Sequence, residues 1–293
     1  MLVEISRSGY LTRQNLALRD ERGRTRAWGS AHDRAAGRML LLVVVDPSLD
    51  ADLADQVADA LFGWGEDAAR TVGRERGLDV QQIDSGAFAA DERQHRWLER
   101  AGFEKVRTWW QMSRPVTPEE ADLAPGVGAG VRIRPVGRQG SGMPDEDDLR
   151  TVHDILESAF ADHFNSHEET FDEFVTRLRA DPGHRWDHWW IAELVDGSRV
   201  EPAGALVGAV SESSDGPDGS YVEYIGVLEN ARGRGVAKSL LRTVIADAAA
   251  RGRDRVGLEV DADSPTGADG LYVAMGWRTS YVTESWHRNV PVR

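Results

Sequence analysis

The chain of 293 residues contains no cysteine, so disulfide bonds, thiolate metal sites and a cysteine nucleophile are all excluded. It also has no apolar run near the ~20 residues of a membrane span and no basic-then-apolar leader. We therefore expect a cytoplasmic protein with no membrane partner. Basic residues are in the minority, with 35 Lys and Arg against 49 Asp and Glu, and this argues against general nucleic-acid binding.

The remaining composition is that of a globular protein, with 41% apolar and 29% charged residues. The length suffices for one large domain or two ordinary ones. A net charge of −14 is compatible with a cationic amine substrate. An acidic surface also simply keeps a protein in solution, and we favour this second interpretation.

Residues 221–245 predict a strand, a glycine-containing turn and a helix in succession. Alternation places four residues on one side of the strand: Tyr221, Glu223, Ile225 and Val227. The helix has apolar residues at helical spacing from Val236 to Ala248. It should end near Arg251 and Gly252, because glycine readily adopts the left-handed closing conformation.

The turn between this strand and helix has the properties of a binding site for a phosphorylated ligand. Unpaired N–H groups and the helix dipole favour an anion at a helix N-terminus. Gly233 and Gly235 let a phosphate approach the backbone, because no Cβ is in the way. Four basic residues add local positive charge: Arg232, Arg234, Lys238 and Arg242.

The spacing excludes a Rossmann loop, because Lys238 stands where a third glycine is needed, and a Walker A motif is absent. The turn resembles the pyrophosphate loop of the GNAT acetyltransferases, with Arg232, Gly235 and Ala237 at its three fixed positions. Downstream, residues 254–260 alternate as a strand. Residues 264–277 (SPTGADGLYVAMGW) are similar to the later family segment N-P-T-G-A followed by L-Y-x-x-x-G-F.

The resemblance implies acetyl-CoA as cosubstrate; separately, no metal is expected. It also implies the residues that hold the coenzyme: Ile225, Gly226, Val227, Arg232, Gly233, Arg234, Gly235, Val236, Ala237, Lys238 and Ser264.

The C-terminal part, residues 131–293, predicts a complete GNAT domain with the order β-α-α-β-β-β-α-β-α-β. Strands are expected at 131–136, 188–195 and 203–210, with a turn at Asp196-Gly197. A first helix should begin after Pro144, with Leu149, Val152, Leu156 and Phe160 inward; a second covers 170–178, capped by Thr170 with Glu173. The expected fold class is α/β (α+β), a mixed twisted sheet flanked by helices.

The N-terminal part, residues 1–114, resembles a degenerate and incomplete copy of the same unit, separated by a linker at 115–130. Strands are expected at 15–20, 26–33 and 39–45, and a helix at 50–70 with Leu53, Val57 and Leu61 inward. Either the copy is truncated by nature or the first residue lies inside a longer gene. This tandem plan resembles that of the mycothiol synthases, which are two-copy members of the family.

When the two copies are aligned with Val45 opposite Val227, Asp50, Leu53 and Asp55 stand where Arg232, Gly235 and Ala237 stand in the second copy. Carboxylates would face a pyrophosphate there, so the first copy should not hold coenzyme A.

Acetyl transfer to an amine needs a base for the ammonium and a proton for the departing thiolate. The resemblance implies that Tyr272 protonates the thiolate, whereas a half-buried structural aromatic is the alternative. The usual base position holds Tyr221 instead of a glutamate. Glu223, two residues later, and Tyr221 both remain candidates for the base, and a solvated strand residue is the alternative role for Glu223.

The expected acceptor region contains His163, His167, His184 and His188 with Trp186, Trp189 and Trp190. No clean metal motif emerges from these histidines. An aromatic-lined pocket is a better interpretation than a metal site, and core packing of the tryptophans is better still.

The sequence therefore predicts an acyl-CoA-dependent N-acetyltransferase acting on a small-molecule or peptide amine. A non-catalytic acyl-CoA-binding or regulatory module is the alternative. The acceptor and the oligomeric state stay open.

Overall fold

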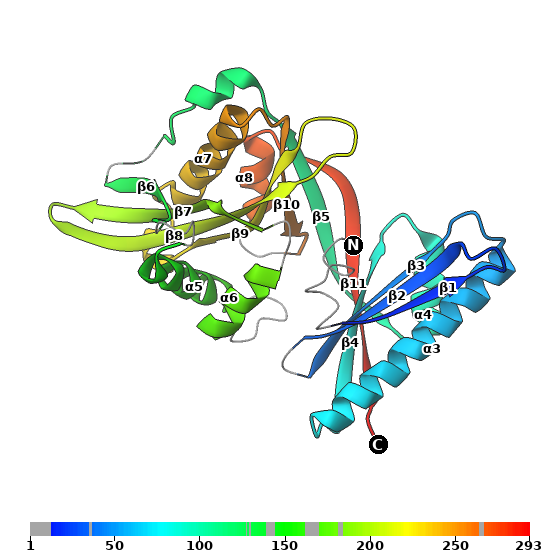
Figure 1. The fold of residues 1–293 in the computed structure, drawn as a ribbon. Helices are drawn as coiled ribbons and strands as arrows, with labels where there is room; N and C mark the ends of the chain where they lie inside the picture. Colours follow the sequence, from blue (N-terminus) through cyan, green and yellow to red (C-terminus); the bar gives the residue numbers. More distant parts are fainter. Residues whose placement is uncertain are drawn as a thin grey trace. The chain divides into compact units, whose positions relative to one another are not determined.

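The computed structural model describes residues 13–34, 37–126, 128, 130–138, 144–161, 170–180, 184–263 and 267–293. The chain forms two compact units (Figure 1). The first comprises Met1–Trp110, Asp261–Pro265 and Tyr281–Arg293, and the second comprises Gln111–Val260 and Thr266–Ser280. The predicted linker at 115–130 falls within the second unit.

The first unit is a mixed sheet with helices packed on it. Its elements are β1 (Arg13–Arg19), β2 (Thr25–Asp33), β3 (Arg38–Val45), α3 (Ala51–Glu75), β4 (Val80–Phe88), α4 (Glu92–Arg100), the first part of β5 (Glu104–Pro115) and most of β11 (Arg278–Pro291). The strand order is β1-β2-β3-β4-β11-β5. Strands β3 and β4 pair in parallel, and the pairs β1/β2, β2/β3 and β4/β11 are antiparallel. The last strand of the chain therefore completes the sheet of the first unit.

Helix α3 buries a stripe of small and apolar residues against the sheet. Leu61, Ala58 and Ala69 are fully buried and join one core with Leu41 and Ile83. Leu53 was predicted to point inward, but it is 42% exposed, so that prediction is wrong. The buried stripe begins one residue later, at Ala54, because the helix starts at Ala51 after the Asp50 cap.

Strand β4 and helix α4 have weak sequence signals and were not predicted. The buried side of β4 contains Gln81 and Ser85 as well as Ile83 and Ala87, so its polarity does not alternate clearly. In α4 only Trp97 and Leu98 are buried. Both elements form because the tertiary core covers these few residues.

The second unit has helices on both faces of its sheet. Its elements are the end of β5, the 3₁₀ helix η1 (Pro118–Asp122), β6 (Val131–Pro135), α5 (Glu146–Phe160), α6 (Phe171–Ala180), β7 (His184–Asp196), β8 (Arg199–Ser211), β9 (Gly219–Val227), the 3₁₀ turn η2 (Glu229–Ala231), α7 (Val236–Ala250), β10 (Arg255–Asp261) and α8 (Ala268–Ala274). The strand order is β5-β10-β9-β8-β7-β6. Helices α7 and α8 lie on one face and α5 and α6 on the other (Figure 1).

The helix caps and turns of this unit agree with the predictions from the sequence. The Asp145 side chain caps α5, and Leu149, Val152 and Leu156 are buried. Thr170 and Glu173 exchange the predicted capping hydrogen bonds at the start of α6. The turn glycine Gly197 has a φ of 58°. Helix α7 ends at Ala250, and Gly252 follows with a φ of 70°.

The two parts of the chain repeat one order of elements, β-β-β-α-β-α-β. This order covers β1 to β5 with α3 and α4, and again β7 to β11 with α7 and α8. Only the second copy is preceded by a strand and two helices, β6, α5 and α6, among the described residues. The predicted internal repeat is therefore present in the fold.

The described residues of 115–130 pack against other parts of the second unit. Arg114 forms an ion pair with Glu120 at η1, and Thr117 and Glu120 form a capping box. A Cβ on Gly128 would stand 2.9 Å from the carbonyl oxygen of Arg234, and one on Gly126 would collide with the Arg242 guanidinium. This segment therefore runs along helix α7.

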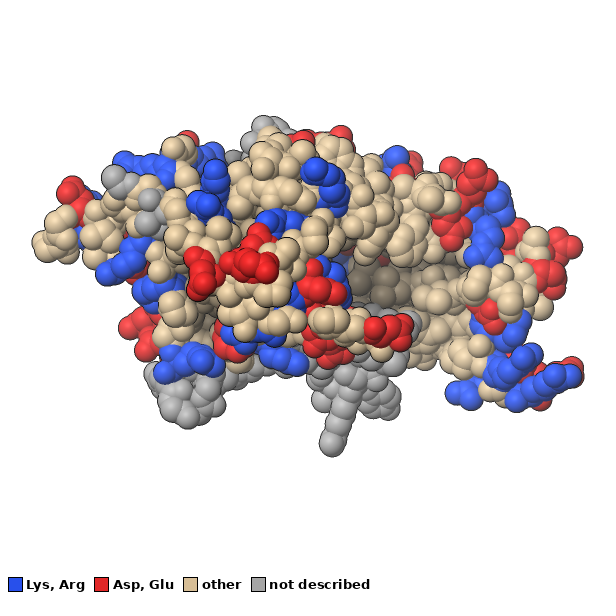
Figure 2. Space-filling view, turned by 90° about the horizontal axis from the view of Figure 1, so that it is seen from above, with Lys and Arg blue, Asp and Glu red and all other residues tan. Residues whose placement is uncertain are grey.

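Within the described residues, no helix is both long and apolar enough to cross a membrane. Acidic and basic side chains are interspersed on the face shown in Figure 2. The net charge of −14 is therefore not gathered into a single acidic field on that face.

Candidate functional site

The N-terminus of α7 has the geometry of an anion site. Gly235 is its N-cap with a φ of 79°, and no side chain caps the helix. Gly233 has a φ of 75°, and a Cβ added at either glycine would meet nothing within 4 Å. The space beside the loop backbone is open, as a bound pyrophosphate requires.

The predicted coenzyme residues divide between exposed charges and buried supports. Arg232, Arg234 and Lys238 are exposed, Ala237 is half-buried, and Val236 is buried against Gly204. Arg242 lies under the segment at Gly126, farther along the helix. Ser264, the remaining predicted residue, lies outside the described residues.

The parallel strands β9 and β10 separate next to this helix. They pair only from Ser220 to Val222 on β9 and from Val256 to Leu258 on β10, although β9 continues to Val227 and β10 to Asp261. In a regular parallel pair the ladder would continue along both strands. The sheet therefore opens between the two strands beyond Val222 and Leu258.

A β-bulge in β9 lies where the two strands separate. Val207 on β8 pairs with Tyr224 and Gly208 with Val222, so Glu223 is the extra residue. The sequence predicts Tyr221, Glu223, Ile225 and Val227 on one side, but the bulge interrupts this alternation. Tyr221 pairs with Ala209 and Gly226 with Ala205, which puts both on one face, while Ile225 and Val227 lie on the other.

The face with Tyr221 and Gly226 is the face that α5 covers. A Cβ on Gly226 would stand 3.0 Å from Ala159 Cβ and 3.2 Å from Leu156 Cδ2. The rings of Phe160 and Tyr224 meet edge to face at 6.3 Å. Glycine at position 226 therefore allows α5 to pack directly on the strand.

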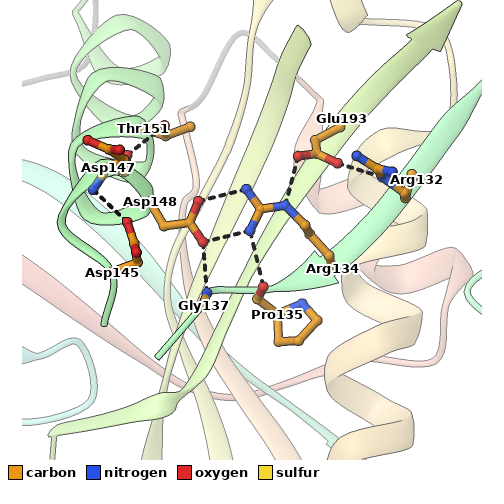
Figure 3. Close-up of polar contacts among 9 residues, drawn as sticks. All are labelled: Arg132, Arg134, Pro135, Gly137, Asp145, Asp147, Asp148, Thr151 and Glu193. Atoms are coloured by element: carbon orange, nitrogen blue, oxygen red, sulfur yellow. Dashed lines mark hydrogen bonds and ion pairs between the residues drawn. The ribbon is translucent and has the colours of Figure 1, made fainter. Parts of the chain in front are cut away.

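A partly buried ion-pair network anchors the start of α5 (Figure 3). Arg134 on β6 donates to both oxygens of Asp148 at 2.6 and 2.7 Å and to Glu193 on β7 at 2.7 Å. Arg132 also donates to Glu193, and Asp148 accepts from the Gly137 N–H. The hydrogen bond from Arg134 lowers the pKa of Asp148, so the pair stays charged and holds α5 to the sheet.

Tyr272 lies on α8, on the same side of the sheet as α7. It is 7% exposed, and its ring lies 6.1 Å from that of Trp277. Burial raises its pKa to about 12. The hydroxyl is therefore protonated at neutral pH, which is the state that donates a proton.

Two carboxylates occupy the first positions beyond the last β9/β10 pair. Glu223 on β9 was predicted, and it is half-buried with its Oε2 atom buried. Glu259 on β10 was missed. Its Oε2 accepts a hydrogen bond from Gln111 on β5. The alternation of Val256, Leu258 and Val260 toward the core left Glu259 on the opposite face, and this signal was present in the sequence.

The acceptor-region aromatic residues mostly form core. Trp189 and Trp190 are 1% and 6% exposed, and Trp189 contacts Trp186 and Phe174. His188 is buried beside Asp187, with Nδ1 2.7 Å from Oδ1, and burial lowers the histidine pKa. His163 and His167 lie outside the described residues. No three His, Asp or Glu side chains within the described ranges come together as a metal would require.

Helix α3 is the equivalent of α7 in the first unit, and side chains of the chain itself already form hydrogen bonds at its N-terminal end. The Asp50 side chain accepts from the Leu53 N–H, and Asp55 accepts from Trp97 Nε1 at 2.6 Å and from Arg100. These hydrogen bonds lower the pKa of Asp55, so its carboxylate stays charged beside Trp97 and Arg100. A shallow cavity of about 460 Å³ in this unit is lined by other residues: His95, Glu99, Phe103, Glu104, Lys105, Glu284 and Trp286.

Residues 149–277 match the model of the acetyltransferase (GNAT) family. The chain is 31% identical over 183 residues to a mycothiol acetyltransferase of Thermobispora bispora, covering 60% of this chain and 55% of that protein. It is 30% identical over 197 residues to one of Frankia casuarinae, covering 66% and 54%. The chain thus matches about half the length of these relatives.

Solved structures show the same fold. A GCN5-related N-acetyltransferase from Sphaerobacter thermophilus superposes with a TM-score of 0.73 at 22% identity, covering 95% of this chain and 81% of that one. A tandem GNAT protein from the clavulanic acid biosynthesis pathway gives 0.70 at 14% identity, covering 95% and 83%. The predicted tandem GNAT-like fold and its resemblance to mycothiol synthase are confirmed.

Proposed function

We propose that this chain, which has a GNAT domain at residues 149–277 and a tandem GNAT-like fold, transfers an acetyl group from acetyl-CoA to a primary amine. The observation that carries the proposal is the gap between β9 and β10 beside the uncapped N-terminus of α7. A phosphate-binding helix start and a nearby opening in the sheet together suit a long ligand with a pyrophosphate at one end.

The coenzyme residues take distinct roles in this proposal. The N–H groups of the first α7 turn bind the pyrophosphate, and Gly233 and Gly235 leave room for it. Arg232, Arg234 and Lys238 supply positive charge from exposed positions. The strand end at Ile225, Gly226 and Val227 offers backbone groups to the pantetheine arm, and the Val227 N–H polarises the thioester carbonyl.

The proton transfers are divided between the two faces of the sheet. On the α8 side, Tyr272 donates its hydroxyl proton to the leaving thiolate as the carbon–sulfur bond breaks. On the α5 side, the acceptor enters as an ammonium ion and must lose a proton before its nitrogen attacks. Tyr221 and Glu223 lie on β9 at this opening, and the reacting amine is placed next to them.

The alternative function is a module that binds acyl-CoA without catalysis. The two functions differ in turnover: transfer of radiolabelled acetyl from acetyl-CoA to a panel of diamines, amino sugars and peptide amines supports the enzyme. Binding of acetyl-CoA with no transfer to any amine would favour the module. Absence of acetyl-CoA binding would contradict both, and mass spectrometry of co-purified coenzyme provides an independent check.

Because the relatives are named mycothiol acetyltransferases, the unacetylated amine form of mycothiol belongs in the amine panel. The alignments cover only about half of those proteins, so the acceptor is decided by the panel and not by the name.

A further inference from the structure

We propose that Glu259 on β10 is the base that removes a proton from the acceptor ammonium, and that Glu223 holds the ammonium across the opening. This inference rests on the proposed acetyl transfer. It also identifies the acceptor as an aliphatic amine that arrives as a cation.

Position supports this assignment first. Leu258 and Val222 form the last pair between the parallel strands, so Glu259 and Glu223 are the next residues on each side of the opening. Gly257 lies against the Tyr221 ring, and Glu259 follows it by two residues on the same strand. Glu259 therefore shares the face of the sheet on which Tyr221 lies, which is the face that α5 covers. A group held between Glu223 and Glu259 therefore lies at the point where the sheet opens.

The surroundings of Glu259 support the role of base. The residue is exposed, so an acceptor can reach it, and its carboxylate accepts a hydrogen bond from the neutral Gln111. Partial loss of water raises the pKa of Glu259 and outweighs the lowering effect of this hydrogen bond. A carboxylate with a raised pKa is a stronger base for an ammonium than an ordinary surface glutamate.

The proton balance is complete. The ammonium gives one proton to Glu259, and the neutral nitrogen attacks the thioester carbon to form the carbon–nitrogen bond. The tetrahedral intermediate then gives its second nitrogen proton to water while the carbon–sulfur bond breaks and Tyr272 protonates the thiolate. Tyr272 regains a proton from solvent, and Glu259 releases the first to solvent.

The test compares Glu259→Gln with Glu223→Gln and with the control Glu212→Gln, an exposed loop residue. Glutamine at 259 can keep the hydrogen bond with Gln111, so the fold is preserved. With the first amine that the wild type accepts, Glu259→Gln should lower kcat at pH 7 by roughly 10²–10⁴-fold. The Kd for acetyl-CoA should stay within about two-fold, and activity should recover in part at higher pH as the free amine deprotonates.

Glu223→Gln should mainly raise the KM for the amine, and Glu212→Gln should match the wild type. The pH dependence of kcat reports on all the groups at the opening. Besides Glu259, these are Tyr221 and Glu223 on β9 and Gln111 on β5. A loss of less than three-fold in Glu259→Gln, or a kcat loss confined to Glu223→Gln, overturns the assignment in an active enzyme. A wild type that binds acetyl-CoA but acetylates no amine overturns the proposed function itself, and this inference with it.

Discussion

Gly257 on β10 lies directly against Tyr221 on β9, and an added Cβ would stand 3.1 Å from Tyr221 Cδ2. The two residues are paired in the short parallel ladder that ends one residue later. A side chain at position 257 must displace the Tyr221 ring, next to the point where the strands stop pairing.

We therefore expect Gly257→Val to lower acetyl transfer by at least ten-fold while acetyl-CoA still binds, because the α7 loop lies elsewhere. Steady-state kinetics with calorimetry separates the two effects. Gly257→Ala should be milder, since only a few tenths of an ångström of movement is needed. Full activity in the valine variant would show that Tyr221 does not border the acceptor.

The phosphate loop gives a second prediction with a matched control. Gly235→Val should abolish acetyl-CoA binding, because its Cβ enters the open space beside the loop. Gly252 lies at the other end of α7 with a φ of 70° and equally open surroundings. Gly252→Val carries a similar left-handed strain of roughly 1–2 kcal/mol but should bind acetyl-CoA normally. Equal loss of binding in both variants would assign the effect to helix strain and contradict the loop assignment.

Calorimetry should find one acetyl-CoA per chain. In the first unit Asp50 already caps α3, and Asp55 is held by Trp97 and Arg100, so a pyrophosphate would meet carboxylates. The remaining site should disappear in Gly235→Val. Two equivalent sites, or one that survives this substitution, would show that the first copy also binds the coenzyme.

Tyr272→Phe should lower kcat by roughly 10²–10⁴-fold with little change in acetyl-CoA affinity. Because burial raises the pKa of Tyr272 to about 12, the hydroxyl stays protonated across the working pH range. Any alkaline fall in kcat below pH 10 must then come from another group.

The same shift makes a stability prediction. Folding favours the neutral phenol, so its contribution is complete below the unfolded value near pKa 10.0 and is lost as the pH rises through about 12. Urea unfolding at pH 9 and pH 11 should show a smaller decline in Tyr272→Phe than in the wild type. An identical decline in both proteins would mean that this tyrosine is not buried in solution.

The Arg134 network predicts a stability difference between two arginines. Arg134→Met leaves Asp148 and Glu193, whose side chains are 14% and 8% exposed, without their shared partner. Because Arg134 is itself one-third exposed, we expect a loss of about 2–3 kcal/mol, below the usual value for a fully buried pair. Arg132→Met removes a half-exposed partner of Glu193 and should change stability by about 1 kcal/mol or less. Urea unfolding measures both variants, and equal losses would contradict the network.

The sequence by itself determined the elements whose signals are local. The Thr170–Glu173 cap, the turn at Gly197, the amphipathic helix after Gly235 and the glycines at 233 and 235 depend on residues a few positions apart. The spacing of Arg232, Gly235 and Ala237 indicated the family for the same reason. The repeat was also visible, because its two copies keep the same order of elements.

Only the tertiary structure decided how distant segments combine. The bulge at Glu223 changes which residues share a face of β9, and it is defined by the pairing with β8 and not by the sequence of β9. The role of Glu259 depends on where β9 and β10 stop pairing, and the last strand of the chain joins the first unit beside β4. Such pairings join residues tens to hundreds of positions apart, so local propensity and periodicity carry no information about them.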